Sequence, residues 1–406
     1  MKTILATAYA INPYKGSEDG MGWNFILQIA RFNNVIAITR ENNREQIEKY
    51  MAENPNDLYQ KIQFLYFDLP YWMRFWKKGG RGAMLYYLMW QRGIVSFIKN
   101  QNLHFEIAHN LNFHNDWTPS FLWKLNKPFV WGSVGHHPLI PAQYLNDYSK
   151  KYWIADRITW LVKNYFWKFS PSLKKTKSSA NHILCMNKEV PKKLNLKANF
   201  SISPSVATQD FGWEPKKDKL NKFTIISAGR FLPLKGFDLT IKAFSKFYHS
   251  LDSNDQKMCE LLLVGSGNEK NYLKSLVNKL GIEHQVKFIS WIERNELMKI
   301  FKTSSAFLFP SHEGAGMVVA EALSFGLPVI CLKNEGPGEF INEKCGYAID
   351  LSDYETTVNN LSNALFELKN NPEKRRQISF AAREQFENHF HWDRRGEQLQ
   401  KIYAEL

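Results

Sequence analysis

The chain has 406 residues and a formal net charge of +14, with 44% hydrophobic and 15% aromatic residues. At about 150 residues per domain this length predicts two or three domains, and the composition suffices for ordinary globular cores. No run of eighteen apolar residues occurs, so we expect no membrane-spanning helix, and the four cysteines have no metal or redox spacing. We expect reduced cysteines and a cytoplasmic protein.

The positive charge is unevenly distributed. Up to Asp210 there are 27 Lys and Arg residues against 14 Asp and Glu residues, whereas from Phe211 onward there are 26 against 25. The first half therefore carries almost the whole excess, which indicates a partner for that half with negative charge.

Six apolar runs of strand length alternate with helical stretches in the first half. This alternation predicts an α/β fold with a doubly wound parallel sheet. The expected strands are Ile4–Ala8, Val35–Thr39, Ile62–Phe67, Phe105–Ala108, Pro128–Trp131 and Ile183–Met186.

A glycine-containing segment, GSEDGMGW, follows the first expected strand and precedes a helix expected at Asn24–Arg31. Loops at this position bind ligands in doubly wound sheets. The segment is an incomplete dinucleotide fingerprint, because Phe25 replaces the third glycine and Arg40, not an acidic residue, follows the second strand. A flexible loop with a tight turn is the alternative.

Two segments of the first half combine basic and aromatic residues. Tyr71–Arg81 has four basic residues and no acidic one, and Lys150–Lys177 has eight basic residues against the single Asp156. Basic residues bind anionic leaflets, and aromatic rings settle at the headgroup level. We therefore expect an anionic membrane surface as a partner, at its inner face, unless these aromatic side chains pack inside the domain.

Residues 105–141 contain four of the eleven histidines, His109, His114, His136 and His137. Their spacing matches no zinc pattern and no cysteine accompanies them, so we expect no metal. His109 ends an expected strand, where it is either a functional residue or a buried histidine with internal partners.

A polar, lysine-rich connector from about Ser205 to Lys222 precedes a second alternating series. Its expected strands are Phe223–Arg230, Leu261–Val264, Gln285–Phe288, Ala306–Phe309 and Val329–Leu332. We therefore predict a first domain at 1–205 with a terminal helix at about 392–406, a linker at 206–221 and a second doubly wound domain at 222–391. Two such domains facing each other across a cleft would form a ligand site.

The second domain carries charges suited to a diphosphate. Arg230 ends its first expected strand, Lys235 precedes the next helix, and Gly314-Ala315-Gly316 opens a helix whose free N–H groups attract anions. Glu313 and Glu321 are eight positions apart, roughly 11–12 Å if both lie on one helix, which suits a nucleotide sugar better than a proton-transfer pair. Solvated surface cations and an exposed helical glutamate are the alternatives.

Three segments resemble the signature of a known family in order and spacing: SAGRFLPLKGFDLTIKAF, VGSGNEKNYLKSLVNKLGIEHQVKFISWIERNEL and PSHEGAGMVVAEALSFGLPVI. They resemble the retaining family-four (group 1) glycosyltransferases of the GT-B fold. The resemblance implies transfer of a sugar from a nucleotide sugar to a saccharide or lipid-linked saccharide acceptor, without a metal or other cofactor. It also implies that a terminal helix returns to the first domain.

The same resemblance implies roles for individual residues. It assigns the transferred sugar's hydroxyls to Glu313, the ribose to Glu321, and the diphosphate to Arg230 and Lys235, with Glu313, His109, Arg230 and Lys235 taking part in catalysis. Further donor contacts are implied for Gly16, Gly265, Gly314, Ala315, Gly316 and Met317, and acceptor contacts for Glu18, His109, His136 and His137. The family's WGPVGG segment reads WGSVGHH here, a departure that alters the expected acceptor pocket.

Two other classes of protein stay open on the sequence alone. A nicotinamide oxidoreductase would share the two doubly wound domains but needs the complete glycine fingerprint. A polyanion or nucleic-acid binder would explain the basic first half, but it would not explain the paired glutamates, the Arg/Lys pair and the glycine helix start of the near-neutral half. We therefore do not expect nucleic acid as a partner.

Overall fold

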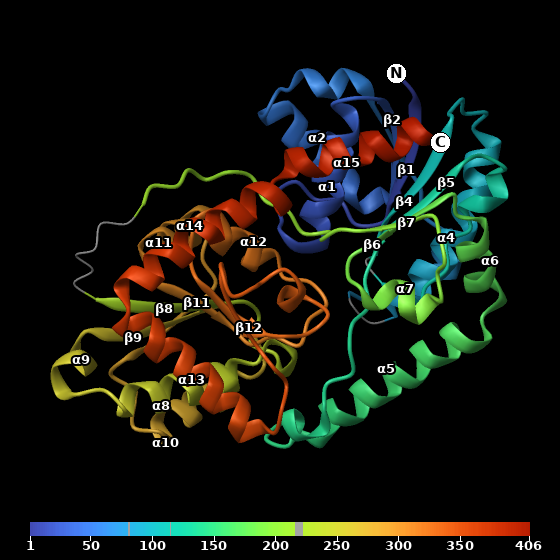
Figure 1. Cartoon of the computed structure of the whole chain (residues 1–406). Helices are drawn as coiled ribbons and strands as arrows, with labels where there is room; N and C mark the ends of the chain where they lie inside the picture. Colours follow the sequence, from blue (N-terminus) through green and yellow to red (C-terminus); the bar gives the residue numbers. More distant parts are fainter. Residues whose placement is uncertain (80–81, 114, 216–221) are drawn as a thin grey trace. The chain divides into compact units, whose positions relative to one another are not determined.

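The computed structural model describes residues 1–79, 82–113, 115–215 and 222–406. The chain packs into two compact units (Figure 1). Unit 1 comprises Met1–His136, Thr159–Ala207 and Trp392–Leu406, and unit 2 comprises His137–Ile158 and Thr208–His391.

Unit 1 contains a seven-stranded parallel sheet in the order β3-β2-β1-β4-β5-β6-β7. Successive strands are added on one side of β1 up to β3 and on its other side from β4 onward, so the strand order reverses between β1 and β4, which pair in parallel. Its strands are β1 (Thr3–Ala8), β2 (Asn34–Thr39), β3 (Ile62–Tyr66), β4 (Ile107–Asn112), β5 (Phe129–Val134), β6 (His182–Cys185) and β7 (Phe200–Ile202). The doubly wound sheet predicted for the first half is confirmed. The three-residue β7 has no apolar run and was not predicted.

The helices of unit 1 are α1 (Ser17–Ala30), α2 (Arg44–Glu53), α3 (Tyr71–Arg74), α4 (Ala83–Asn100), α6 (Pro171–Ser179), α7 (Glu189–Leu194) and α15 (Trp392–Glu405). A further helix, α5 (Lys150–Phe169), begins in unit 2 and ends in unit 1. Large buried rings, among them Trp90 and Trp131, fill the core of unit 1.

The terminal helix α15 packs on α1 within unit 1. The ring of Trp392 lies 5.4 Å from that of Phe25, and Asp393 Oδ1 lies 2.7 Å from Arg31 Nη1. A Cβ atom at Gly396 would lie 2.4 Å from Gln28 Oε1. The last fourteen helical residues therefore fold with the first unit, although unit 2 precedes them in sequence.

Unit 2 contains a six-stranded parallel sheet in the order β10-β9-β8-β11-β12-β13. Its strand order reverses between the parallel neighbours β8 and β11. Its strands are β8 (Phe223–Ala228), β9 (Cys259–Val264), β10 (Val286–Ile289), β11 (Ala306–Phe309), β12 (Val329–Leu332) and β13 (Gly346–Ile349). The second predicted sheet is confirmed as well.

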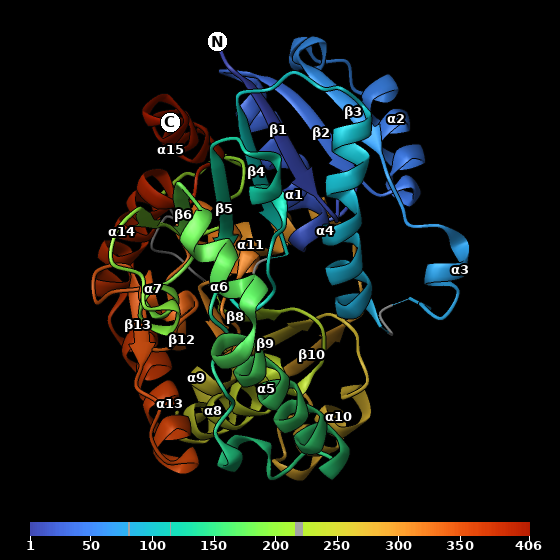
Figure 2. The same ribbon diagram turned by 90° about the vertical axis from the view of Figure 1, so that its right-hand side faces the viewer.

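Helices cover both faces of the unit 2 sheet. They are α8 (Phe237–His249), α9 (Ser253–Lys257), α10 (Lys270–Lys279), α11 (Arg294–Thr303), α12 (Met317–Ser324), α13 (Tyr354–Asn370) and α14 (Pro372–His389). In Figure 1, α8, α10 and α13 lie beside one another on one side of the sheet, and α11, α12 and α14 lie on the other. Figure 2 shows the same elements from the side.

The predicted division places residues 137–158 in the first domain, whereas in the structure they belong to unit 2. Ile140, Tyr144 and Tyr148 are buried in the unit 2 core, and the Tyr148 hydroxyl donates to Asp238 Oδ1 at 2.5 Å. No change of composition marks this segment. Of the predicted linker at 206–221, residues 216–221 lie outside the described residues, and Thr208 already pairs with His391 in unit 2.

Candidate functional site

The sequence-predicted donor residues gather at the carboxyl ends of β8 and β11, where the strand order of unit 2 reverses. In doubly wound sheets this is the position at which ligands bind. Arg230 and Lys235 follow β8, whereas Glu313 and the segment Gly314–Gly316 follow β11. The fold of unit 2 therefore brings these residues to one edge of the sheet.

Two glycines with positive φ allow the loops at this edge to touch. A Cβ atom at Gly265 (φ +148°) would lie 1.9 Å from the carbonyl oxygen of Gly229, and one at Gly236 (φ +66°) would lie 2.1 Å from that of Pro310. Only glycine fits such close backbone contacts. Gly236 therefore holds the turn that carries Lys235 against the end of β11.

Lys235 and Glu313 form an ion pair across this edge, with 2.5 Å between Nζ and Oε2. Their side chains are 13% and 18% exposed, so the pair is largely shielded from water but still reachable. Arg230 is exposed and forms no ion pair with the residues that the structure describes. The three charges leave an excess of one positive charge at this edge of the sheet.

The N-terminus of α12 offers N–H groups to an anion. Gly316 occupies the cap position and supplies no side chain, and the N–H groups of a helix's first turn have no partner inside the helix. Two residues before this cap, the N–H of Gly314 donates to Nδ1 of His137 at 3.1 Å. The backbone N–H groups of residues 315–318 are the donors that remain, so an anion would bind at this turn.

Ser311 and Asn334 position this loop, and neither was predicted. The Glu313 N–H donates to Ser311 Oγ at 3.2 Å, and Asn334 Nδ2 donates to the Ser311 carbonyl at 2.7 Å. A Cβ atom at Gly336 would lie 2.0 Å from the Glu313 carbonyl oxygen. The signal in the sequence was the segment NEGPGE after β12, whose glycines permit this contact.

The predicted spacing of the two glutamates is wrong, because Glu313 does not lie on the helix. α12 begins at Met317, so Glu313 belongs to the preceding loop and only Glu321 is helical. The Glu321 side chain is 6% exposed; its Oε1 accepts a hydrogen bond from Arg294 Nε at 2.9 Å and lies 2.8 Å from Arg294 Nη2 in an ion pair. Burial raises the pKa of Glu321, although Arg294 acts in the opposite direction. Glu321 is therefore a buried residue with an internal partner and not an exposed helical glutamate.

Glu321 keeps one oxygen for a further partner. Arg294 engages Oε1, while Oε2 accepts no hydrogen bond from the described part of the chain. Arg294 is itself fixed by Thr208 Oγ1 at 2.9 Å. The sequence did not predict Arg294 as a partner of Glu321, because it lies 27 positions earlier and in a different segment.

In unit 1 the glycine segment is helical, not a loop. α1 begins at Ser17, directly after Gly16, so Glu18 lies in its first turn and Gly20 and Gly22 lie inside it. A Cβ atom at Gly22 would lie 2.2 Å from the carbonyl oxygen of Ala10. These glycines let α1 approach the backbone that follows β1, so the helix expected at Asn24–Arg31 starts seven residues earlier.

His109 is a buried histidine with internal partners, which is the second of the two alternatives that the sequence leaves open for it. It is 0% exposed, and its Nε2 lies 2.6 Å from the Gly132 carbonyl oxygen and its Nδ1 lies 2.5 Å from the Tyr403 hydroxyl. Because a carbonyl only accepts, Nε2 carries the proton and Nδ1 accepts from Tyr403. Burial lowers the pKa of His109 to about 3.

The neighbouring His136 and His137 lie in different units. His136 is 6% exposed, its Nδ1 lies 2.8 Å from Asp116 Oδ2, and its ring packs against Trp160 and Trp167 in unit 1. His137 lies in unit 2, where it holds Gly314. Of the four histidines singled out in the sequence, His137 contacts the donor loop, and His114 lies outside the described residues.

Nowhere in 1–79, 82–113, 115–215 or 222–406 do three His, Cys, Asp or Glu side chains gather in a way that would hold a metal ion. Within the same ranges no helix combines the length and the apolar character that crossing a membrane requires.

Residues 212–385 match the model of the family "Glycosyl transferases group 1". An uncharacterized glycosyltransferase of Haemophilus influenzae is 33% identical over 41% of this chain and 45% of its own length. A GDP-mannose-dependent monoacylated alpha-(1-6)-phosphatidylinositol monomannoside mannosyltransferase of Corynebacterium glutamicum is 29% identical over 43% of this chain and 45% of its own length. The chain thus spans about half the length of these curated relatives.

Among solved structures, Anabaena HepE in complex with UDP and glucose aligns over 100% of both chains, with a TM-score of 0.62 and 15% identity. This likeness concerns the fold. Residues 212–385, which lie in unit 2, thus match the group 1 glycosyltransferase family, and the chain as a whole has the GT-B fold.

Proposed function

We propose that the protein is a retaining glycosyltransferase that moves a sugar from a nucleotide-sugar donor to a saccharide acceptor, in the synthesis of a cell-surface polysaccharide or lipid-linked glycan. The observation that carries the proposal is the Lys235–Glu313 pair beside the uncapped start of α12, within the segment that matches the family model. It places a cation for a diphosphate next to a carboxylate for sugar hydroxyls.

Each donor group has a matching partner at this edge of unit 2. Arg230, Lys235 and the N–H groups of 315–318 neutralise the diphosphate as negative charge develops on it. Glu313 accepts from hydroxyls of the transferred sugar, and Oε2 of Glu321 accepts from the ribose. These fixed charges take the part of a metal ion, so the proposed reaction is metal-independent.

In the proposed reaction the bond between the sugar C1 and the diphosphate oxygen breaks, and a bond from C1 to an acceptor oxygen forms on the same face. The acceptor's proton passes to the leaving diphosphate, so the protein supplies position and charge. Two carboxylates around the bond, about 5–5.5 Å apart, would be needed for a double displacement. Here Lys235 and Arg294 hold the two candidate carboxylates separately.

The proposal is tested by a thermal-shift screen over UDP, GDP, ADP and their sugars, followed by turnover with the nucleotide sugar that binds. A ligand at 100 times its Kd raises the free energy of unfolding by about 2.7 kcal/mol. We expect one nucleotide to stabilise the protein, turnover to persist in EDTA, and the product to keep the donor's anomeric configuration by NMR. No stabilisation by any nucleotide would contradict the proposal, and inversion would contradict its retaining part.

Replacing Arg230 or Lys235 by Ala is expected to weaken the binding of the nucleotide diphosphate by about 1–3 kcal/mol each, as for hydrogen bonds to charged groups. Isothermal titration with the bare nucleotide measures this. Lys302→Ala, an exposed lysine of the same unit at the end of α11, is the matched control. Unchanged affinity in both site variants would mean that the phosphates bind elsewhere.

We further propose that the enzyme works at the inner face of a membrane. α5 has no buried residue, and Ile154, Ile158, Leu161 and Tyr165 follow one another at helical spacing, with exposures of 48%, 56%, 67% and 59%. Lysines lie on the same helix, and Tyr71, Trp72 and Phe75 at α3 are 60–74% exposed. Exposed rings beside cations suit an anionic leaflet, although Trp76 packs against Tyr86 instead.

Co-sedimentation with vesicles of graded anionic lipid content tests this membrane proposal. We expect binding at low salt that falls strongly in the variants Leu161→Ser with Tyr165→Ser and Trp72→Ser with Phe75→Ser. Trp291→Ser, which removes a ring that is 70% exposed in unit 2, is expected to leave binding unchanged. Equal binding by all variants, or none by the wild type, would favour a soluble acceptor.

A further inference from the structure

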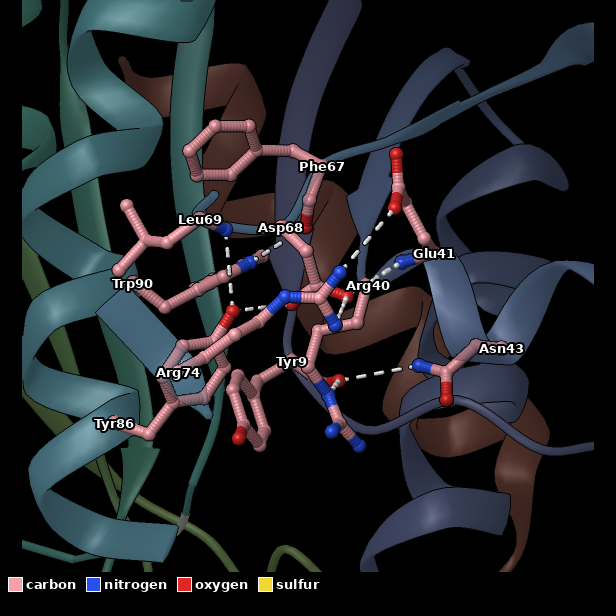
Figure 3. A network of polar contacts seen from close by, with 10 residues as sticks. All are labelled: Tyr9, Arg40, Glu41, Asn43, Phe67, Asp68, Leu69, Arg74, Tyr86 and Trp90. Carbon is pink, nitrogen blue, oxygen red and sulfur yellow. Dashed lines mark hydrogen bonds and ion pairs between the residues drawn. The ribbon is translucent and has the colours of Figure 1, made fainter. Parts of the chain in front are cut away.

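A second charged cluster lies in unit 1, at the carboxyl ends of β1, β2 and β3. Tyr9 follows β1, Arg40 follows β2 and Asp68 follows β3 by two positions, while Arg74 ends α3 (Figure 3). The three strands are neighbours in the sheet, so these residues share one edge. Ala10, next to Tyr9, is the residue on which Gly22 of α1 packs.

The two carboxylates of this cluster are committed to internal partners. The Asp68 side chain is 4% exposed, accepts from the Tyr86 hydroxyl at 2.5 Å and lies 3.9 Å from Arg74. Glu41 lies 4.0 Å from the same arginine. Figure 3 shows Arg74 reaching toward both carboxylates, so its charge is balanced and it holds α3 in place.

Together with Arg74, the cations Arg40 and Lys77 outnumber the two carboxylates of this cluster by three to two. Neither forms an ion pair with the residues that the structure describes; Lys77 Nζ donates to the Gly79 carbonyl and lies 5.8 Å from the Tyr86 ring centroid. The pKa of Lys77 is lowered, chiefly by burial and then by the positive charge of Arg40. The two cations lie over neighbouring rings, since the ring centroids of Tyr9 and Tyr86 are 6.2 Å apart.

Arg40 is held so that the end of its side chain stays available. Its Nε donates to the Tyr9 carbonyl at 3.1 Å, and its guanidinium lies 4.1 Å from the centroid of the Tyr9 ring. Asn43 Nδ2 donates to the same carbonyl at 3.1 Å. Both terminal nitrogens of Arg40 donate to no described residue, which leaves a planar fork that matches a phosphate or a carboxylate.

The Tyr9 hydroxyl is a second unsatisfied group at this place. Tyr9 is 2% exposed, and its hydroxyl has no hydrogen-bond partner among the described residues. Buried hydroxyl groups are nearly always paired, so the Tyr9 hydroxyl has a hydrogen bond left to make with a water molecule or a ligand.

We infer that Arg40 and Lys77, beside Tyr9, form a binding site for an anionic group of the acceptor, a phosphate monoester or a carboxylate carried on a sugar. The assignment of this anion to the acceptor rests on the proposed function, because only a glycosyltransferase has such an acceptor. The site lies at the edge of unit 1 from which α1 begins, whereas the proposed donor residues lie in unit 2.

The test is a ligand-observed NMR titration with glucose 1-phosphate, glucuronic acid and the neutral methyl α-glucoside. We expect the two anionic probes to bind the wild type and the neutral probe to bind far more weakly. Arg40→Gln and Lys77→Gln are each expected to weaken anionic binding by roughly 10-fold, the size of a lost hydrogen bond to a charged group. Arg44→Gln is the matched control, since Arg44 also lies over a tyrosine ring, 4.3 Å from that of Tyr66.

Two variants separate this site from the donor site. Lys235→Gln is expected to leave anionic binding in place, and Arg40→Gln is expected to leave the binding of bare nucleotide in place. Equal binding by Arg40→Gln, Lys77→Gln and Arg44→Gln, or loss in Lys235→Gln alone, would overturn the inference. Failure of every nucleotide to bind would instead count against the proposed function.

A lipid headgroup is the other source of a phosphate. Vesicles containing phosphatidic acid distinguish it: if Arg40→Gln lowers vesicle binding while the sugar anions bind neither protein, the site belongs to a lipid and the inference is overturned. Thermal unfolding of Arg40→Gln checks its fold, and Lys77→Gln carries the test if Arg40→Gln does not fold.

Discussion

Replacing Glu313 by Gln is expected to lower kcat by about 10²–10³-fold, the usual effect of removing one preorganised group from a transition state. Gln keeps the shape of the side chain and can still accept from Lys235, which lies 2.5 Å from Oε2. It removes the negative charge that we propose holds the sugar hydroxyls. The proposed nucleotide contacts from Arg230 and the start of α12 stay in place, so the Kd for bare nucleotide is expected to change little.

Isothermal titration with the nucleotide and a turnover assay with its sugar measure the two effects separately. The control is Glu343→Gln, which changes an exposed glutamate of the same unit. Full turnover in Glu313→Gln would remove Glu313 from the catalytic residues. A parallel loss of nucleotide affinity would mean that the Lys235–Glu313 pair acts mainly by shaping the phosphate site.

The second sheet could be predicted closely because its signals are local. β11 and β12 have the predicted bounds, since each is a short apolar run ended by residues that stop a strand. Arg230, Lys235 and Glu313 could be placed together because the carboxyl ends of parallel strands share an edge. The glycines at 236 and 265 were visible in the sequence, but the backbone contacts that require them were not.

The errors concern features that depend on distant partners. The start of α1 was misplaced because Gly20 and Gly22 suggest a loop, whereas close packing of Gly22 on Ala10 requires glycine within a helix. Residues 137–158 were placed in the first domain because nothing local reveals that Tyr148 bonds Asp238, ninety positions away. Contacts between distant segments override local propensity in these cases.

His109 shows the same limit at the level of a single residue. Its place at the end of the expected strand favours function, but β4 continues to Asn112. Only the structure reveals the Tyr403 hydroxyl, 294 positions away, at its Nδ1. Arg40 is the converse case. In the sequence it is a basic residue where a dinucleotide fingerprint needs an acidic one. In the structure it lies over the Tyr9 ring and bonds the Tyr9 carbonyl, which makes it a candidate anion-binding residue.

The buried His109 is expected to make the protein less stable in mild acid. Burial lowers its pKa to about 3, below the ordinary value of 6.5. Between these values the unfolded chain binds a proton that the folded chain does not, so the free energy of unfolding falls as the pH falls below 6.5. The slope is about 1.4 kcal/mol per pH unit, or about 2 kcal/mol between pH 7 and pH 5.

His312 in unit 2, whose pKa burial lowers to about 4, is expected to act in the same direction. Urea unfolding at pH 7 and pH 5 measures the total loss, and His109→Gln isolates one part of it. Gln is expected to cost about 1–3 kcal/mol at pH 7, because it pairs imperfectly with Gly132 and Tyr403, but it should reduce the loss between pH 7 and pH 5 by about 2 kcal/mol. His104→Gln, at an exposed position of unit 1, should leave that loss unchanged. A His109 ring signal that titrates near pH 6.5 by NMR would contradict the prediction, because a ring bonded at both nitrogens inside the core cannot take up a second proton without losing Tyr403 as its donor.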